Sequence, residues 1–204
     1  MNPRSDDGKS ARTRTRILDA AAHVLARNGC AGTRLSDIAA IARVRTPAIY
    51  YYFDSREALV EEVVTIGMVR NLDHVRAAVA AAPETASAMD RLCAAVEAHL
   101  RVVLRSSDYT VAAVRNTTQL PPAIRARHVA EQQRYIDVWR ELVEAARRAG
   151  ELHDDLDGRA ARMLVLGALN WACEWWSPKR GSMRAIISTA QAIVRRGLGT
   201  PNSP

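Results

Sequence analysis

The residues best suited to chemistry in this sequence are an arginine, a threonine and three consecutive tyrosines between positions 45 and 52. An arginine can form two hydrogen bonds with a guanine edge, and threonine and tyrosine hydroxyls can bond phosphates or bases. Thr46 is a good helix N-cap, and Pro47 suits the first position of a helix. The pattern predicts a short helix from Thr46 to Tyr52 whose leading side chains read double-stranded DNA.

A second short helix is expected just before it, capped by Thr33 or Ser36 and ending at Ala42. Two helices of this length joined by a short turn meet the size of a helix-turn-helix. Residues at the start of the first helix, and an arginine after the Ser55 cap, are placed to bind phosphates. The predicted DNA contacts are Arg34, Ser36, Arg45, Thr46, Pro47, Tyr50, Tyr51, Tyr52 and Arg56. Tyrosines at helical spacing that pack in a core are the competing interpretation.

The charge of the chain is concentrated at its beginning. The 204 residues carry a formal net charge of +7. Up to Arg56 there are ten Lys and Arg against five Asp, whereas the rest of the chain is nearly balanced. This asymmetry favours a polyanionic partner for the first quarter of the chain alone.

Several classes of protein are disfavoured by what the sequence lacks. The five histidines are scattered and form no HExxH motif, and neither a nucleophile elbow nor a phosphate-binding glycine loop is present. We therefore expect no enzyme activity, no cofactor and no metal. The three cysteines are far apart and fit reduced thiols. No apolar run approaches the ~20 residues of a membrane span, so we expect a cytoplasmic protein that does not enter the membrane.

Helical periodicity dominates the whole chain and predicts an all-α fold of about nine helices. We expect an N-terminal three-helix bundle that contains the helix-turn-helix, over residues 11–55. A C-terminal helical domain for ligand binding and dimerisation should follow over residues 56–199, with disordered tails at 1–10 and 200–204. The segment Arg159–Trp176 is apolar nearly all round, which indicates burial on more than one side.

The sequence of the N-terminal segment resembles that of the TetR family of repressors. The resemblance covers Ile17 to Leu59 and is carried by Thr33-Arg34-Leu35-Ser36-Asp37-Ile38-Ala39 and by Ala48-Ile49-Tyr50-Tyr51-Tyr52-Phe53-Asp54-Ser55-Arg56-Glu57-Ala58-Leu59. Arg43 stands where the family turn usually has glycine, and Arg45-Thr46-Pro47 replaces a common Ser-Lys-Gly. The resemblance implies a homodimer, formed by the last two helices of each subunit in a four-helix bundle.

A further motif concerns the effector. Leu166-Gly167-Ala168-Leu169-Asn170-Trp171 and the closing Arg195-Arg196-Gly197-Leu198 look like a TetR branch that senses acyl-coenzyme A thioesters in sterol and fatty-acid catabolism. Aromatic and aliphatic walls with a few polar anchors would suit such a ligand. The predicted ligand residues are Met68, Leu72, Leu104, Tyr109, Arg115, Tyr135, Trp139, Arg162, Asn170, Trp171 and Trp175. In the competing interpretation, the tryptophans fill the core and the dimer seam, and the arginines are solvated.

The expected function is that of a repressor that leaves operator DNA when a small hydrophobic effector binds. An alternative is a TetR-type repressor of an efflux pump that senses cationic drugs by cation–π contacts. Acidic residues in the pocket would favour the drug sensor, whereas arginine-lined walls would favour the thioester. A helical adaptor that binds no DNA would require Arg45, Thr46 and Tyr50 to be buried.

Overall fold

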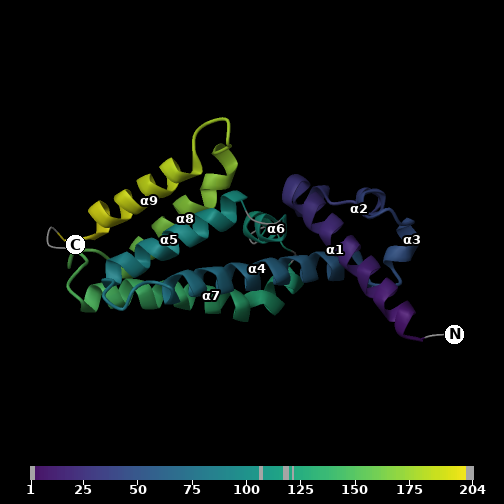
Figure 1. Ribbon diagram of the computed structural model, residues 1–204, viewed down its shortest axis with the longest axis horizontal. Helices are drawn as coiled ribbons and strands as arrows, with labels where there is room; N and C mark the ends of the chain where they lie inside the picture. Colours follow the sequence, from purple (N-terminus) through teal and green to yellow (C-terminus); the bar gives the residue numbers. More distant parts are fainter. Residues whose placement is uncertain (1–2, 106–107, 117–119, 121, 201–204) are drawn as a thin grey trace. The chain divides into compact units, whose positions relative to one another are not determined.

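Helices dominate the structure, a computed structural model that describes residues 3–105, 108–116, 120 and 122–200. In chain order the helices are α1 (Pro3–Gly32), α2 (Leu35–Ala42), α3 (Thr46–Ile49), α4 (Arg56–Ala80), α5 (Ala88–Arg105), α6 (Asp108–Asn116), α7 (Pro122–Arg148), α8 (Gly158–Trp175) and α9 (Met183–Leu198) (Figure 1). Over these residues, extended backbone pairs only in an isolated bridge between Leu152 and Gly199. The predicted all-α fold is confirmed.

The helices gather into two compact units, and α4 and α7 contribute residues to both. The N-terminal unit comprises Met1–Met68 and Ser107–His128, and the C-terminal unit comprises Val69–Ser106 and Val129–Pro204. We expected one boundary, between residues 55 and 56. The structure divides the chain differently, because α6 packs along α1 and so joins the N-terminal unit.

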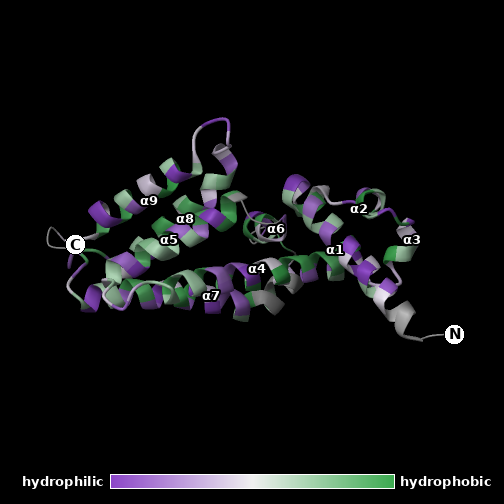
Figure 2. Cartoon of the chain, in the orientation of Figure 1, coloured by the Kyte–Doolittle hydropathy of each residue, from purple (hydrophilic) through white to green (hydrophobic). Residues whose placement is uncertain are grey.

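The N-terminal unit is held by one apolar core. The apolar stripe of α1 meets α2, α3, the first turns of α4 and α6, as expected for amphipathic helices. Hydrophobic and hydrophilic residues alternate along these helices in Figure 2. The largest fully buried side chains of this core are Ile17, Leu25, Ile38, Ile49, Leu59 and Val60.

Helix α1 differs from expectation at both ends. It begins at Pro3, within the segment that we expected to be a loose tail. A glycine after an apolar helical stripe favours a helix end, and Gly29 does leave the helical region, at a φ of 70°, but helical structure continues to Gly32. The Cys30 N–H after this kink donates to Asn116 Oδ1 of α6 at 2.7 Å. The kink is therefore stabilised by a side chain far away in sequence.

Helix caps in the two units agree only partly with the sequence prediction. Neither Thr33 nor Ser36 caps α2, because the N-cap residue is Arg34, whose side chain makes no capping bond. The Thr33 hydroxyl instead donates to the Gly29 carbonyl at 2.7 Å. Ser55 does cap α4, since its Oγ accepts from the Ala58 N–H at 3.0 Å.

The C-terminal unit packs α5 against α8 and α9, and the second parts of α4 and α7 contribute to the same core. Helix α5 begins at Ala88. Ser87 and Asp90 there exchange side-chain and backbone hydrogen bonds at 3.1 and 3.2 Å, which forms a capping box. No helix among the described residues is long and apolar enough to cross a membrane.

Candidate DNA-reading surface and ligand-binding core

The turn between α2 and α3 has the geometry of a helix-turn-helix. Arg43 follows α2 in the left-handed region, at φ 54° and ψ 49°. Its N–H bonds the Ala40 carbonyl at 3.3 Å, and the Val44 N–H bonds the Ala39 carbonyl at 3.0 Å. These bonds end α2 and redirect the chain into α3. The arginine thus adopts the conformation that glycine usually supplies in the family turn.

Helix α3 is short and is anchored by its apolar side. Its N-cap is Arg45, so Thr46 and Pro47 occupy the first two helical positions, one place later than predicted. The helix ends at Ile49, and Tyr50–Tyr52 form a turn instead of continuing it. Ile49 and Phe53 are buried in the core of the N-terminal unit. The opposite side of this segment is therefore held at the surface.

Most of the predicted DNA-contacting residues lie on the surface of the N-terminal unit. Tyr51 is 81% exposed and Tyr50 is 56% exposed, so neither tyrosine packs in a core. Thr46 is partly exposed. The remaining exposed members are Arg34, Ser36, Arg45 and Pro47. The adaptor interpretation, which required Arg45, Thr46 and Tyr50 to be buried, is wrong for this reason.

Two of the predicted contacts have structural roles instead. Tyr52 is partly buried, packs against the core and meets the Tyr51 ring edge-on at 5.0 Å between centroids. Arg56 Nε donates to the Thr33 carbonyl at 2.8 Å, and its Nη2 donates to the Cys30 carbonyl. We expected Arg56 to bind phosphate, which stays a prediction. In the single chain its guanidinium ties the start of α4 to the end of α1.

Three of the predicted ligand residues belong to the N-terminal unit. The Tyr109 hydroxyl donates to Asp19 Oδ1, and Arg115 Nη1 donates to the Ala26 carbonyl, each at 2.9 Å. Met68 packs against the core of the same unit. Tyr109 and Arg115 thus hold α6 on α1, together with Asn116. Their place on a ligand pocket stays a prediction beside this packing role.

Tyr135 and Trp139 contact His99, a histidine that we did not predict, in the core of the C-terminal unit, and Leu104 packs against the same core. His99 Nδ1 lies 2.5 Å from the Tyr135 hydroxyl. The His99 and Trp139 rings are edge-to-face, with 5.9 Å between centroids. His99 is 1% exposed and Trp139 is fully buried. The available signal in the sequence was helical spacing: His99 lies three residues after Val96 and four before Val103, on the apolar side of a helix.

Burial changes the protonation of this core. It lowers the pKa of His99 from 6.5 to about 4, and a weaker interaction with the Asn170 amide acts in the opposite direction. Burial also raises the pKa of Tyr135, against smaller opposing effects of Trp139 and Asn71. Both side chains are therefore neutral at pH 7. Asn71 and Leu72, on α4, are buried as well.

Helix α8 carries the remaining predicted ligand residues, and most of them face outward in the single chain. Asn170 is exposed, Trp171 is 65% exposed and Trp175 is 47% exposed. Arg162 is partly buried. We expected this helix to be buried on more than one side. One side is buried, whereas its other apolar side chains are exposed: Met163, Leu164, Trp171 and Trp175.

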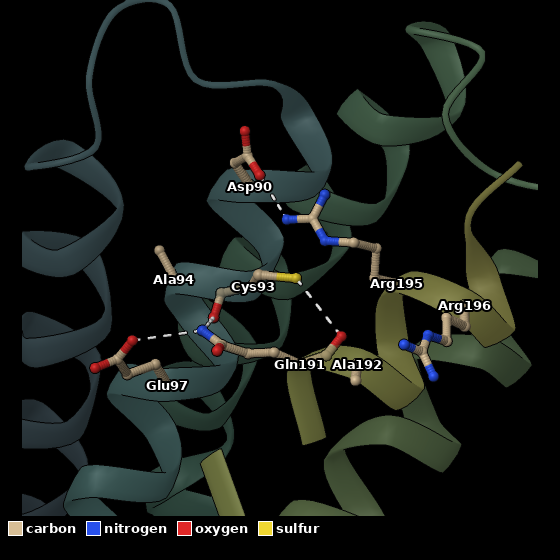
Figure 3. Close-up of a pocket in the computed structure, with 8 residues that line it drawn as sticks. All are labelled: Asp90, Cys93, Ala94, Glu97, Gln191, Ala192, Arg195 and Arg196. Carbon is tan, nitrogen blue, oxygen red and sulfur yellow. Dashed lines mark hydrogen bonds and ion pairs between the residues drawn. The ribbon is translucent and has the colours of Figure 1, made fainter. Parts of the chain in front are cut away.

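A polar groove lies between α5 and α9 (Figure 3). The Asp90 and Arg195 side chains form an ion pair there at 2.5 Å, and the arginine lowers the pKa of this carboxyl. Gln191 Nε2 donates to the Cys93 carbonyl at 3.1 Å. Burial raises the pKa of the Cys93 thiol, which keeps the sulfur in its less reactive form. The ion pair and the hydrogen bond join α5 to α9, so the groove is a feature of the packing between these two helices.

Two family models match the chain, and together they cover residues of both units. Residues 17–63 match the family described as bacterial regulatory proteins, tetR family. Residues 85–198, more than half of the chain, match the one described as tetracyclin repressor-like, C-terminal domain. The chain belongs to the TetR family. The predicted family membership is confirmed.

Two named regulators and one solved structure are similar to the chain over most of its length. The HTH-type transcriptional repressor KstR2 of Rhodococcus jostii (strain RHA1) is 27% identical over 210 residues, which cover 98% of each chain. The fatty acid metabolism regulator protein of Bacillus subtilis (strain 168) is 22% identical, over 89% of this chain and 93% of its own. The crystal structure of AibR in complex with isovaleryl coenzyme A and operator DNA matches with a TM-score of 0.80 at 23% identity, over 89% of this chain and 97% of AibR, and therefore shows the shared fold.

Proposed function

We propose that this TetR-family chain is a transcription repressor that binds operator DNA as a homodimer and leaves it when an acyl-coenzyme A thioester binds to its C-terminal unit. The observation that carries the proposal is that the α3 segment is anchored on one side and exposed on the other. Ile49 and Phe53 anchor it in the core, while Arg45, Tyr50 and Tyr51 remain exposed. A helix meant only for packing would not expose tyrosines beside an arginine. This function belongs in the cytoplasm, where the DNA lies.

The exposed residues have the chemistry that a DNA reader needs. Arg45 and Thr46 lie at the N-terminal end of α3, the end that faces base edges when a recognition helix enters the ~12 Å-wide major groove. Arg34 and Ser36 lie at the start of α2, where that helix crosses the phosphate backbone. The basic balance of the first 56 residues supports the same partner.

We propose a second copy of the chain as the partner of the exposed apolar side of α8. Exposing a surface cluster of large apolar side chains to water is unfavourable. Such a cluster on two helices marks a protein interface. Its members are Met163, Leu164, Trp171 and Trp175 of α8 and Ile193 of α9. A dimer also presents two reading helices, which doubles the length of DNA recognised.

The effector assignment rests on the relatives and on the chemistry of the C-terminal unit. AibR binds isovaleryl coenzyme A, KstR2 of Mycobacterium tuberculosis is a ketosteroid transcriptional regulator, and the Bacillus subtilis relative is a fatty acid metabolism regulator. The core around Leu104, Tyr135 and Trp139 combines apolar surface with neutral polar groups. It offers no carboxylate to a cation, so nothing favours the drug-sensing alternative. Arg162, at the edge of the same unit, remains a candidate for the coenzyme phosphates.

Release from DNA would be a shift between two populations of the dimer. A ligand changes such an equilibrium only by its difference in affinity for the two states, and ~1–3 kcal/mol of coupling already weakens DNA binding ~5–150-fold. Helices α4 and α7 both contribute residues to both units, and α4 begins at Arg56, directly after the exposed tyrosines, and continues to Ala80. We propose that α4 carries the coupling.

The test is DNA binding by fluorescence anisotropy, on a labelled fragment from upstream of the gene for this protein. Arg45→Ala is expected to lower affinity by about tenfold or more, because one good arginine contact contributes ~1–3 kcal/mol. Arg148→Ala, an exposed arginine of the C-terminal unit, is the matched control and should bind like the wild type. Hexanoyl-coenzyme A should release the fragment. Equal loss in both variants, or unchanged binding at saturating thioester, would contradict the proposal.

A further inference from the structure

Three basic residues, Lys9, Arg12 and Arg16, form a stripe along one side of the first turns of α1. They are spaced by three and four residues, so their side chains share one face of the helix. All three are exposed. The same face continues into Ala20, which is buried in the core of the N-terminal unit. The basic stripe is therefore the part of this face that extends beyond the core (Figure 1).

Apolar packing does not account for the helix at these positions. Ala11 is the only apolar side chain between residues 8 and 16, and the same residues include four basic side chains and no acidic one. The Thr13 and Thr15 hydroxyls donate to carbonyls one turn earlier, at 3.0 and 3.1 Å, and such bonds do not favour a helix. Like charges three and four residues apart also destabilise it. A polyanion beside this segment would remove the repulsion.

The side of α1 that faces α4 is already neutralised by the chain itself. Arg14 forms an ion pair with Glu62 at 2.5 Å, and its guanidinium lies 4.9 Å from the centroid of the Phe53 ring. Within the part of the chain that the structure describes, no ion pair engages Lys9 or Arg12. The charges of these two residues are therefore available to a partner.

The basic stripe begins at the turn of the helix-turn-helix. Arg16 Nη2 donates to the Ala42 carbonyl, at the end of α2, at 2.9 Å. The next residue along the chain is Arg43 of the turn, and Arg45 is the N-cap residue of α3; both are exposed. From Arg16 the stripe continues over about 10 Å to Lys9, at ~1.5 Å per residue. The positive surface beside α3 is thus prolonged along α1.

The composition of the basic stripe suits phosphates. A lysine ammonium is a mobile point charge, and an arginine can bond a phosphate through two N–H groups. One strand of DNA presents a phosphate about every 3.4 Å along the helix axis, so a row of ~10 Å spans about three of them. Contacts of this kind add affinity and orientation but carry no sequence preference.

We propose that the basic stripe of α1 binds the DNA phosphate backbone beside the half-site that α3 reads. This inference rests on the proposed function for its partner, double-stranded DNA, and it adds a contact element outside the helix-turn-helix. Each subunit of a dimer contributes one stripe. Because bound phosphates release their counterions, the contribution of the stripe decreases as the salt concentration rises.

The test is the salt dependence of DNA binding by the full chain, measured by fluorescence anisotropy. One labelled fragment comes from upstream of the gene for this protein, and a second has the same length and a random sequence. The double variant Lys9→Ala with Arg12→Ala removes four charges from a dimer, so the slope of log K against log salt should become shallower by about 3–4. Affinity for both fragments should fall by the same factor.

Two further double variants serve as controls. Arg76→Ala with Arg148→Ala removes the same charge from exposed positions of the C-terminal unit and should keep the wild-type slope. Lys9→Arg with Arg12→Lys keeps both charges of the stripe and should keep the slope as well. Since alanine favours helices, circular dichroism should show unchanged helix content in the first double variant.

The outcomes separate this proposal from the function on which it rests. An unchanged slope after alanine replacement of the stripe, or an equal change in the C-terminal control, would overturn the stripe as a DNA contact. A shallower slope in a protein that does not prefer the upstream fragment would support the stripe and contradict operator reading. A wild type that binds neither fragment would contradict both.

Discussion

At the scale of single residues, Arg43 reconciles a sequence departure with the geometry of the turn. A glycine reaches the left-handed region without strain, whereas a side chain there costs about 1 kcal/mol. Arg43 nevertheless occupies it, at φ 54°, since the two backbone bonds that end α2 demand that conformation. Arg43→Gly should therefore raise the free energy of unfolding by up to about 1 kcal/mol in urea denaturation. Arg27→Gly, at an exposed position of α1, should lower it by a similar amount, and stabilisation by both would contradict the strain argument.

The buried histidine makes stability depend on pH with a defined sign. The folded chain protonates His99 only near pH 4, whereas the unfolded chain protonates it near the ordinary pKa of 6.5. The unfolded state therefore binds more protons between these values, and stability falls as the pH falls through that window. From pH 7 to pH 5 the contribution to the loss is about 2 kcal/mol, on the order set by the shift. Urea denaturation of His99→Gln should show a smaller loss over this range, and His74→Gln should behave like the wild type.

At the scale of helices, α4 and α6 of the N-terminal unit approach each other closely at Gly67. A methyl group added to Gly67 would lie 2.1 Å from the Tyr109 carbonyl oxygen and 2.8 Å from the Ala113 Cβ. Only a glycine permits the backbone of α6 to lie so near α4. This contact, with the Asn116 bonds to α1, explains why α6, which is distant in sequence, belongs to the N-terminal unit.

Gly67→Ala should therefore destabilise the chain by about 1–3 kcal/mol or more, because backbone must move to make room. The measurement is thermal denaturation followed by circular dichroism. Gly197→Ala is the control, since its added methyl meets nothing within 4 Å in the chain. A melting temperature for Gly67→Ala equal to that of the control would show that α6 can retreat at little cost.

At the scale of the whole molecule, the proposed dimer depends on the apolar side of α8 and its neighbour Ile193. Leu164 is 74% exposed and Trp171 is 65% exposed in the single chain. The double variant Leu164→Glu with Trp171→Glu should convert the dimer to a monomer in light scattering, because charged groups would be buried without partners. DNA affinity should fall with it, since two reading helices bind one site. Val129→Glu, at an exposed position of α7, should stay dimeric, and a dimer in both variants would place the interface elsewhere.

Much of this protein was readable from local sequence. The apolar spacing from Ile17 to Leu25, the Ser55 cap and the glycine and proline breaks predicted the helices, because a helix is decided by residues within a few turns of one another. The tyrosine-rich segment after Thr46 predicted the family and the exposed DNA-reading side for the same reason. These predictions hold because each depends only on residues that are close together in the sequence.

Tertiary structure alone decided which distant side chains meet. Arg56 had the sequence context of a phosphate ligand, yet its guanidinium donates to the Cys30 and Thr33 carbonyls at the end of α1. Tyr109 and Arg115 had the composition of a pocket, yet they attach α6 to α1. His99 was one of five scattered histidines until α5 and α7 placed it against Tyr135 and Trp139. Such partners depend on helix packing across dozens of residues, which periodicity does not encode, because the period describes one face of one helix and not what covers it.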